Sequence, residues 1–205
     1  MTASDAFVIW LATPDDIPVI AHHRAAMFRD IESAPVELYE ALRVSTAERL
    51  REMFAEGRYV GWLAAPADEP RHAVAGVGVH KRQVQPFPRT RDDGRVEITQ
   101  GRQALVVNVY TEPEFRRKGL ARQLMDALME WASTAGVDAL ILHAAPNGRP
   151  LYESLGFKQT NEMRYQRDIS TWKRAMSRSL STFCRDPRLQ PKLFQNHRKH
   201  PTRYH

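Results

Sequence analysis

The sequence has 205 residues, 42% of them hydrophobic, which is enough to bury the core of one domain with a modest appendage. Its apolar runs are far shorter than the roughly 20 residues of a membrane-spanning helix, and its single cysteine, Cys184, excludes an internal disulfide. The net charge of +6 is a weak argument for a nucleic-acid partner, because residues 170–205 alone hold nine of the 30 basic side chains beside one acid.

The distribution of charge predicts two regions. Residues 1–169, with 21 basic and 23 acidic side chains, are expected to form the globular domain. Residues 170–205 lack a periodic apolar face, so we expect a basic tail that is disordered or loosely attached. No basic cluster precedes an apolar stretch at the N-terminus, and together with the lone cysteine this predicts a cytoplasmic protein.

The N-terminal quarter predicts a strand followed by two helices. Residues 7–11 form a short apolar run, and Thr-Pro-Asp-Asp at 13–16 is a typical helix start, so a helix is expected over 14–29. A second helical region is expected over 35–57. Within it, Ser-Thr-Ala-Glu at 45–48 resembles a capping box that would begin its main helix.

The middle of the chain predicts strands and one long loop. Residues 59–64 and 73–80 are expected to form consecutive strands. Residues 83–95 contain two prolines and the turn Asp-Asp-Gly, and a loop of this length in a compact domain is either functional or mobile. The strand expected over 104–110 is apolar on both faces, which places it near the centre of its sheet.

The remaining elements alternate between helix and strand. Leucine, tryptophan and alanine recur at helical spacing over 118–135, which predicts an amphipathic helix. A buried strand over 139–143, a short helix over 149–155 and a last strand or hairpin over 157–166 follow. The predicted order, β-α-α-β-β-β-α-β-α-β, is that of an α/β domain.

The segment Arg-Arg-Lys-Gly-Leu-Ala at 116–121 joins the central strand to the amphipathic helix. The first N–H groups of a helix lack internal partners and carry partial positive charge, so they bind anions. A glycine there lets the backbone approach a phosphate closely. Because neither G-x-x-x-x-G-K-[ST] nor an opening G-x-G-x-x-G is present, the ligand is expected to be a pyrophosphate other than that of ATP or NAD.

Two motifs resemble the GNAT superfamily of N-acetyltransferases. Residues 116–121 match its signature [Q/R]-x-x-G-x-[G/A], and Leu-Tyr-Glu-Ser-Leu-Gly-Phe at 151–157 is similar to its L-Y-x-x-x-G-F segment. The element order also agrees over 7–166. The resemblance implies a three-layer fold, with helices on both faces of a mixed central sheet of six to seven strands that splays between its fourth and fifth strands.

The resemblance also implies where acetyl-CoA, the co-substrate, would bind. Its pantetheine arm would lie between the strands over 104–110 and 139–143, paired with backbone groups of the first, and its pyrophosphate would lie on the loop over 116–122. The residues implied to contact it are Val107, Val109, Tyr110, Thr111, Arg116, Arg117, Lys118, Gly119, Leu120, Ala121, Arg122, Asn147 and Tyr152.

The family's chemistry needs an acid and a base. Tyr152 is implied to be the general acid, since a phenol of pKa near 10 stays protonated at neutral pH and can protonate the leaving thiolate. Some members carry a glutamate early in the fourth strand, but this sequence has Leu105 and Val106 there. The base is therefore left open between Glu97, Glu112, His143 and backbone carbonyls acting through water, while a backbone N–H, that of Val109, is expected to stabilise developing negative charge.

The acceptor is not determined by these residues. The resemblance implies transfer to a primary amine of an unidentified small molecule or peptide, with direct attack in a ternary complex. The missing strand-four glutamate leaves a non-catalytic CoA-binding module as an alternative, and the basic tail leaves an RNA-linked substrate as another. No metal site is expected, no membrane partner is expected, and a homodimer is left open.

Overall fold

The computed structural model describes residues 6–91, 93–160 and 163. The chain divides into two compact units, Met1–Phe157 and Lys158–His205, and every helix and strand below belongs to the first. Residues 157–160 form no strand, and the rest of the segment expected to be a last strand or hairpin, like the expected tail over 170–205, lies outside the described residues. No helix in the described part is long and apolar enough to cross a membrane.

The main sheet has five strands in the order β1-β2-β3-β6-β7. They are β1 (Phe7–Leu11), β2 (Tyr59–Pro66), β3 (Ala75–Gln83), β6 (Arg102–Thr111) and β7 (Ala139–Leu142). Every pair is antiparallel except β6 and β7, which are parallel. The mixed α/β class is confirmed, although the described residues supply five strands to this sheet where six to seven were expected.

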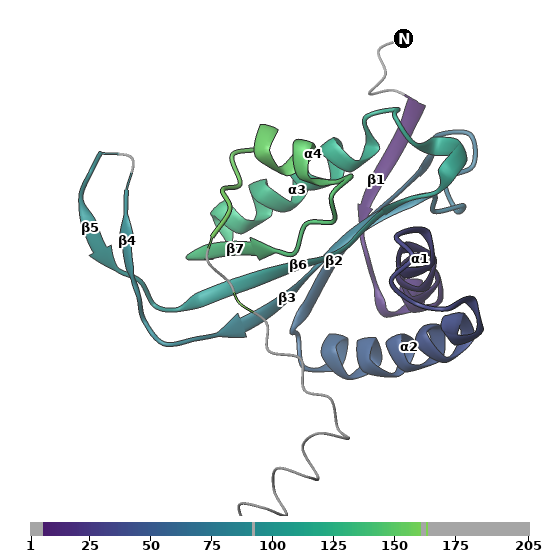
Figure 1. The fold of residues 1–205 in the computed structure, drawn as a ribbon, viewed down its shortest axis with the longest axis horizontal. Helices are drawn as coiled ribbons and strands as arrows, with labels where there is room; N and C mark the ends of the chain where they lie inside the picture. Colours follow the sequence, from purple (N-terminus) through teal and green to yellow (C-terminus); the bar gives the residue numbers. More distant parts are fainter. Residues whose placement is uncertain (1–5, 92, 161–162, 164–205) are drawn as a thin grey trace, which may run out of the picture. The chain divides into compact units, whose positions relative to one another are not determined.

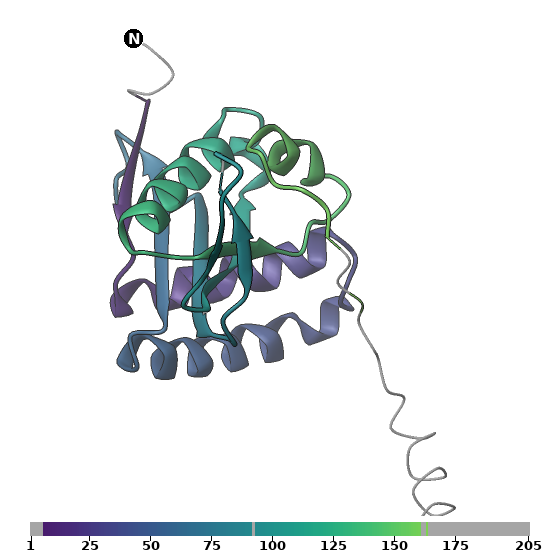
Figure 2. The ribbon, with the colours of Figure 1, turned by 90° about the vertical axis from the view of Figure 1, so that its left-hand side faces the viewer.

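Helices cover both faces of the sheet. Helices α1 (Ile17–Asp30) and α2 (Tyr39–Ala55) lie on one face, and α3 (Leu120–Thr134) and α4 (Arg149–Ser154) on the other (Figures 1 and 2). Each layer has its own apolar core. Leu120, Leu124 and Leu128 of α3 are fully buried against β2, β3 and β6, while Ile20 of α1 and Leu50 of α2 are buried on the opposite face.

The first helix begins as the sequence predicts. The Thr13 backbone N–H donates to the Asp16 carboxylate at 2.8 Å, closing a capping box around a short 3-10 turn, η2 (Pro14–Asp16), from which α1 continues. The prediction of a second capping box, at residues 45–48, is wrong. Residues 45–48 lie inside α2, which runs without a break from Tyr39 and follows a different turn, η3 (Val36–Leu38). The side chain of Thr46 is buried there because the helix packs on α1.

The expected loop over 83–95 is in part a two-stranded ribbon, so that prediction is corrected. Strand β4 (Pro88–Thr90) pairs antiparallel with β5 (Val96–Ile98), with Arg89 opposite Glu97. Figure 1 shows this ribbon projecting beyond the ends of β3 and β6. A cross-strand pair of opposite charges stabilises such a ribbon. Its strands have only 3 residues each, too few for an apolar alternation from which they could be predicted.

A β-bulge interrupts β6 in its second half. Gly78 of β3 is opposite Val107, but Gly76 is opposite Tyr110, so β6 holds one residue more than its partner between them. The extra residue is Asn108, which is buried and has φ of 57°. Because a bulge shifts side-chain alternation, Val107 and Asn108 both face α1 and α2, whereas Val106 and Val109 pack toward α3.

Candidate active site

Strands β6 and β7 stay together over only part of their length. Their pairing runs from Gln103↔Ala139 to Val106↔Leu142, and β6 then continues to Thr111 while β7 has ended. Past Val106, the edge of β6 that faced β7 has no partner strand among the described residues. The bulge at Asn108 lies immediately beyond this point. The expected divergence of the two parallel strands is therefore present, and it exposes backbone groups that a ligand can pair with.

The loop from β6 into α3 has an unusual backbone. Arg117 has φ of 63° and Gly119, the N-cap of α3, has φ of 85°. Leu120, Ala121 and Arg122 form the first turn, whose N–H groups have no intrahelical acceptor. A Cβ built on Gly119 would meet only the Gln123 side chain, at 3.8 Å. Open space at this glycine fits a close-lying ligand better than a packing requirement.

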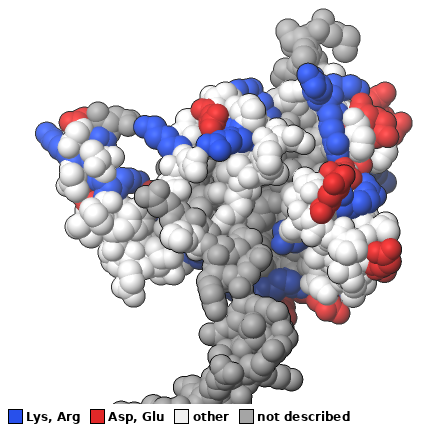
Figure 3. All heavy atoms as spheres, in the orientation of Figure 1, with Lys and Arg blue, Asp and Glu red and all other residues white. Residues whose placement is uncertain are grey.

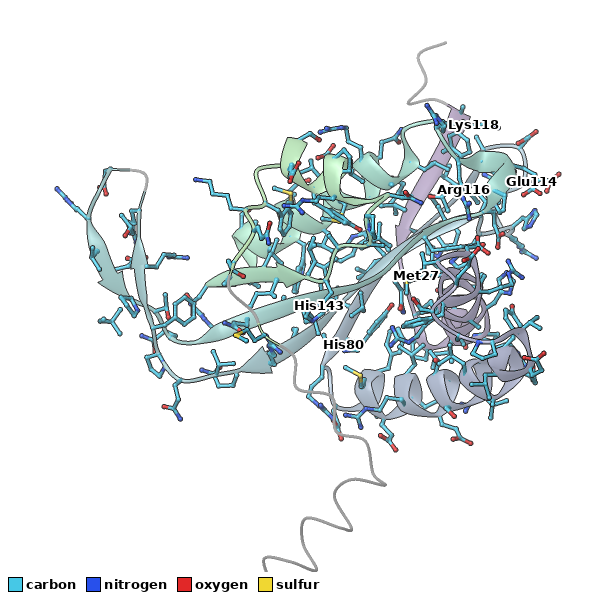
Figure 4. The ribbon with its side chains drawn as sticks, viewed as in Figure 1. Met27, His80, Glu114, Arg116, Lys118 and His143 are labelled. Atoms are coloured by element: carbon cyan, nitrogen blue, oxygen red, sulfur yellow. The ribbon has the colours of Figure 1, made fainter. Side chains whose placement is uncertain are left out.

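The basic side chains of this loop point in different directions (Figure 4). Arg116 turns toward α1, where it pairs with Asp30 and donates from Nε to the Thr111 carbonyl oxygen at 2.9 Å. The Lys118 ammonium lies 4.8 Å from the Phe115 ring centre, and Arg122 donates to Ser154 Oγ at 2.5 Å. Figure 3 shows basic and acidic side chains next to one another over this corner. Arg116 thus holds the loop against α1, while the N–H groups of the first turn of α3 have no acceptor within the helix.

Tyr152 is on α4, which covers the same face of the sheet as α3. Its side chain is partly buried and packs against that layer's core, with its ring 6.1 Å from the Phe157 ring. Burial raises the pKa of the Tyr152 phenol. A Cβ on Gly148 would lie 3.0 Å from the Tyr152 ring, so this glycine leaves room for the tyrosine. Asn147, expected to touch the cofactor, is exposed just before α4.

Glu97, one candidate base, lies on the β4–β5 ribbon. Its carboxylate accepts from Arg91 Nε at 2.7 Å and from Arg89 Nε at 3.1 Å. The hydrogen bonds from Arg91 and Arg89 lower the pKa of the Glu97 carboxyl. Two cations held on one carboxylate make it a poorer proton acceptor, so the geometry favours the other candidates.

Glu112, the second candidate, follows β6 directly. Its Oε1 is 2.8 Å from His22 Nε2 on α1, and its Oε2 accepts from the Tyr110 hydroxyl at 3.1 Å. His22 Nδ1 is in turn 2.5 Å from the Tyr39 hydroxyl on α2. The Glu112 carboxylate is thus tied to both helices of one layer, and its side chain keeps 22% of its surface exposed.

His23 is fully buried next to this network. Neither ring nitrogen makes a hydrogen bond within the described part of the chain, and the nearest carboxylate oxygen, Glu112 Oε1, is 3.9 Å from Nε2. Burial lowers the pKa of His23 to about 4, and the Glu112 charge offsets only part of that shift. The imidazole is therefore neutral at physiological pH, and a Cβ on Gly76 would stand 3.2 Å from its Nδ1.

Two histidines lie where β6 and β7 part (Figure 4). His143, the third candidate base, follows the last residue of β7 and is exposed. His80 of β3 is opposite Leu105, which is in turn opposite Ile141 of β7. Burial, with the charges of Arg24, Arg49 and Arg58, lowers the pKa of His80 to about 4. Sequence reasoning missed His80, because its place opposite the position of the family glutamate depends on the register of β3.

Sequence reasoning also missed a polar cluster on the α1 and α2 face of the bulge. Arg24 Nη1 of α1 donates to Asn108 Oδ1 at 2.7 Å. The buried ring of Tyr59 lies beneath the sheet here, with its hydroxyl 2.2 Å from where a Cβ of Gly78 would stand. The alternation of glycines in β3 was the available signal: it marks a strand that another group approaches closely.

The fold is a mixed α/β domain in which the parallel strands β6 and β7 separate near the N-terminus of α3 and the partly buried Tyr152 of α4. Comparison with known proteins shows what the chain is similar to. The model of an acetyltransferase (GNAT) domain matches residues 93–177. Over 60 residues, the chain is 37% identical to the [ribosomal protein bS18]-alanine N-acetyltransferase of Salmonella typhimurium, a match that spans 28% of this chain and 40% of that protein.

Solved structures agree with this match. A GCN5-related N-acetyltransferase from Ralstonia eutropha superposes with a TM-score of 0.68 at 25% identity, covering 78% of this chain and 98% of that one. An acetyltransferase from Clostridium acetobutylicum, solved with acetyl-CoA, gives a TM-score of 0.63 at 22% identity, covering 78% and 96%. The expected resemblance to the GNAT superfamily of N-acetyltransferases is therefore confirmed by the family model over residues 93–177 and by the shared fold.

Proposed function

We propose that this protein is an acetyl-CoA dependent N-acetyltransferase that acts on a primary amine by direct attack in a ternary complex. One observation carries the proposal: β6 loses its parallel partner after Val106 and runs on, unpaired on that edge, to the N-terminus of α3. An extended ligand with a pyrophosphate at one end can pair along the unpaired edge of β6 and place its pyrophosphate at the N-terminus of α3. The acetyl-CoA in the Clostridium acetobutylicum structure supports this choice of ligand for the shared fold.

The residues present fit acetyl-CoA. The unpaired edge of β6, at Val107, Val109 and Thr111, would hold the pantetheine arm, and the first turn of α3 beside Gly119 would hold the pyrophosphate. When bound, acetyl-CoA supplies the acetyl group and a thiol leaving group. Arg117 and Lys118 are exposed at the same loop and add positive charge near the phosphates.

Tyr152 would hold the proton that the departing thiolate takes. Because burial raises the pKa of its phenol, Tyr152 stays protonated throughout the physiological range. The acceptor amine must also lose a proton, since an ordinary alkylamine is only about one part in a few thousand neutral at pH 7. Glu112 and His143 are the candidates to accept that proton. The hydrogen bond between Glu112 and His22 offers a path along which the proton can leave Glu112.

The acceptor belongs to the proposal as well. The Salmonella typhimurium relative acts, by its name, on an alanine of a ribosomal protein, which adds a protein N-terminus to the small amines and peptides to be considered. Its match spans well under half of that enzyme, so the acceptor is proposed only as a primary amine. A cytoplasmic location is part of the same proposal.

Titration of the protein with acetyl-CoA, followed by thiol release on a panel of amines, peptides and aminoglycosides, tests the function. We expect cofactor binding and thiol release that depends on the acceptor. Failure to bind acetyl-CoA contradicts the proposal. Binding without turnover on the whole panel, with slow hydrolysis alone, supports the non-catalytic CoA-binding module instead.

A further inference from the structure

Arg24 has an unusual environment for a cation. It is partly buried on α1, with its guanidinium 5.0 Å from the Phe28 ring centre and Nη1 donating to the amide oxygen of Asn108 at 2.7 Å. Burial lowers the pKa of Arg24. A guanidinium presents five donors, so one bond to a neutral amide satisfies only a fraction of them.

No carboxylate pairs with Arg24 within residues 6–91 and 93–160. Other arginines nearby are matched: Arg29 and Arg116 share Asp30, and Arg43 pairs with Glu40. A partly desolvated charge without a counter-charge is costly, and an anionic ligand would supply the missing partner. The contact with Asn108 does not require a charge, because a neutral amide donor would make the same bond.

Two further arginines lie near His80 and Arg24, and each is paired with an acid, Arg49 with Glu52 and Arg58 with Glu56. The pKa of nearby His80 is lowered by the charges of Arg24, Arg49 and Arg58 as well as by burial, and no acid offsets that shift. Tyr59 brings a neutral hydroxyl, because burial raises the pKa of its phenol. Asp30 and Glu112, two acids of this layer, are already bound to Arg116 and His22. An anion entering here meets a cation, a neutral imidazole and a phenol.

Arg24 lies beside the point where β6 loses its parallel partner β7. Asn108, which Arg24 holds, is the bulge residue just past the last β6–β7 pair. We propose that the acceptor is an amine that also carries an anionic group, a carboxylate or a phosphate, and that Arg24 binds this group. The inference rests on the proposed function, because it assigns the acceptor side of the same site.

Matched probe pairs test the inference by binding. The acetyl-CoA-loaded protein is titrated calorimetrically with phosphoethanolamine against ethanolamine, and with 3-aminopropionate against 3-aminopropionamide. We expect at least one anionic member to bind about tenfold or more tightly than its neutral counterpart, as a charge-assisted bidentate contact provides. The pair that shows the larger ratio distinguishes phosphate from carboxylate.

Variants separate charge from structure. Arg24→Gln can still donate to Asn108 and is expected to abolish the preference while leaving the neutral probes within about twofold. Arg24→Lys is expected to keep part of the preference. Arg43→Gln, an exposed arginine of α2 paired with Glu40, is the control and should change neither. Equal melting temperatures of the variants show that each has folded.

Equal affinity for both members of each pair, binding of neither member, or a preference that survives Arg24→Gln overturns the inference. Those results leave the enzymatic proposal standing if acetyl-CoA binds and thiol is released with any amine. Conversely, selective binding of an anionic probe together with no turnover on the whole panel of amines supports the anion site and contradicts the enzymatic proposal.

Discussion

Tyr152 is where the chemistry can be tested at a single atom. Replacing Tyr152 with Phe removes the hydroxyl and keeps the ring that packs on Phe157. Because a positioned acid contributes roughly 100- to 10,000-fold, we expect kcat to fall by about 100-fold or more. The dissociation constant of acetyl-CoA should stay within about twofold. Stopped-flow thiol release and fluorescence titration measure the two quantities.

The opposite pattern gives Tyr152 a different role. If kcat is retained, the hydroxyl is not the acid, and if acetyl-CoA affinity falls together with the melting temperature, the residue is structural. Phe157→Leu is a useful companion, because it disturbs the same ring contact without touching the hydroxyl.

His23 makes the stability of the protein depend on pH. The unfolded chain binds a proton at this residue with an ordinary pKa near 6.5, whereas the folded chain resists it until about 4. The unfolded state therefore holds more protons between these values, and stability falls as the pH falls through that window. We expect His23 to account for about 2 kcal/mol of lost unfolding free energy between pH 7 and pH 5.

Urea unfolding of His23→Asn at both pH values measures this contribution. Between pH 7 and pH 5 the variant should lose less unfolding free energy than the native chain, by about 2 kcal/mol. His72→Asn, at an exposed position, is the control and should follow the native chain. A native-like pH dependence in His23→Asn would place the acid sensitivity elsewhere.

At the scale of elements, the sequence predicts those helices and strands that a local residue pattern determines. The amphipathic spacing over 118–135 and the apolar run over 104–110 correspond to α3 and β6, within two residues at each end. The capping box at 45–48 is wrong because a local motif inside a longer helix is overridden by packing between α1 and α2. The β4–β5 ribbon was missed because its pairing rests on cross-strand charges.

The same division holds for the site. The loop over 116–121 and Tyr152 are sequence-local motifs, so their places were predictable. The cluster of Arg24, Asn108 and His80 joins α1, β6 and β3 through contacts between residues far apart in the chain. Strand register and a one-residue bulge create it, and neither can be derived from composition or spacing.

Gly119 tests the start of α3 as an anion site. Gly119→Ala places a Cβ in open space at a left-handed position, so the backbone penalty should be about 1 kcal/mol. We expect acetyl-CoA to bind at least about tenfold more weakly, because the methyl group stands between backbone and phosphate. Gly57→Ala shares the positive φ and the open surroundings, and it serves as the control at the end of α2. Equal losses of affinity in the two variants would show that strain alone is responsible.

At the scale of the whole molecule, the limits of the domain can be tested by truncation. The family model reaches residue 177, whereas the sequence placed the end of the domain at 169. We expect a chain of residues 1–177 to keep the melting temperature and the acetyl-CoA affinity of the full protein. A chain of residues 1–169 cuts into the matched region and is expected to melt lower. Differential scanning calorimetry with and without acetyl-CoA compares the three, and equal melting of the two shorter chains would support the boundary at 169.

The bulge in β6 changes which residue numbers face each layer of the protein. Upstream of Asn108, even-numbered side chains such as Val106 belong to the α3 layer, and downstream the odd-numbered Val109 takes that place. Without this one residue, Val107 and Val109 would alternate regularly and Tyr110 would still face α1, so the bulge absorbs the extra residue and leaves the register beyond it unchanged. The bulge thus adds the side chain of Asn108 to the face of the strand that α1 and α2 cover, and it keeps Val109 on the face that α3 covers.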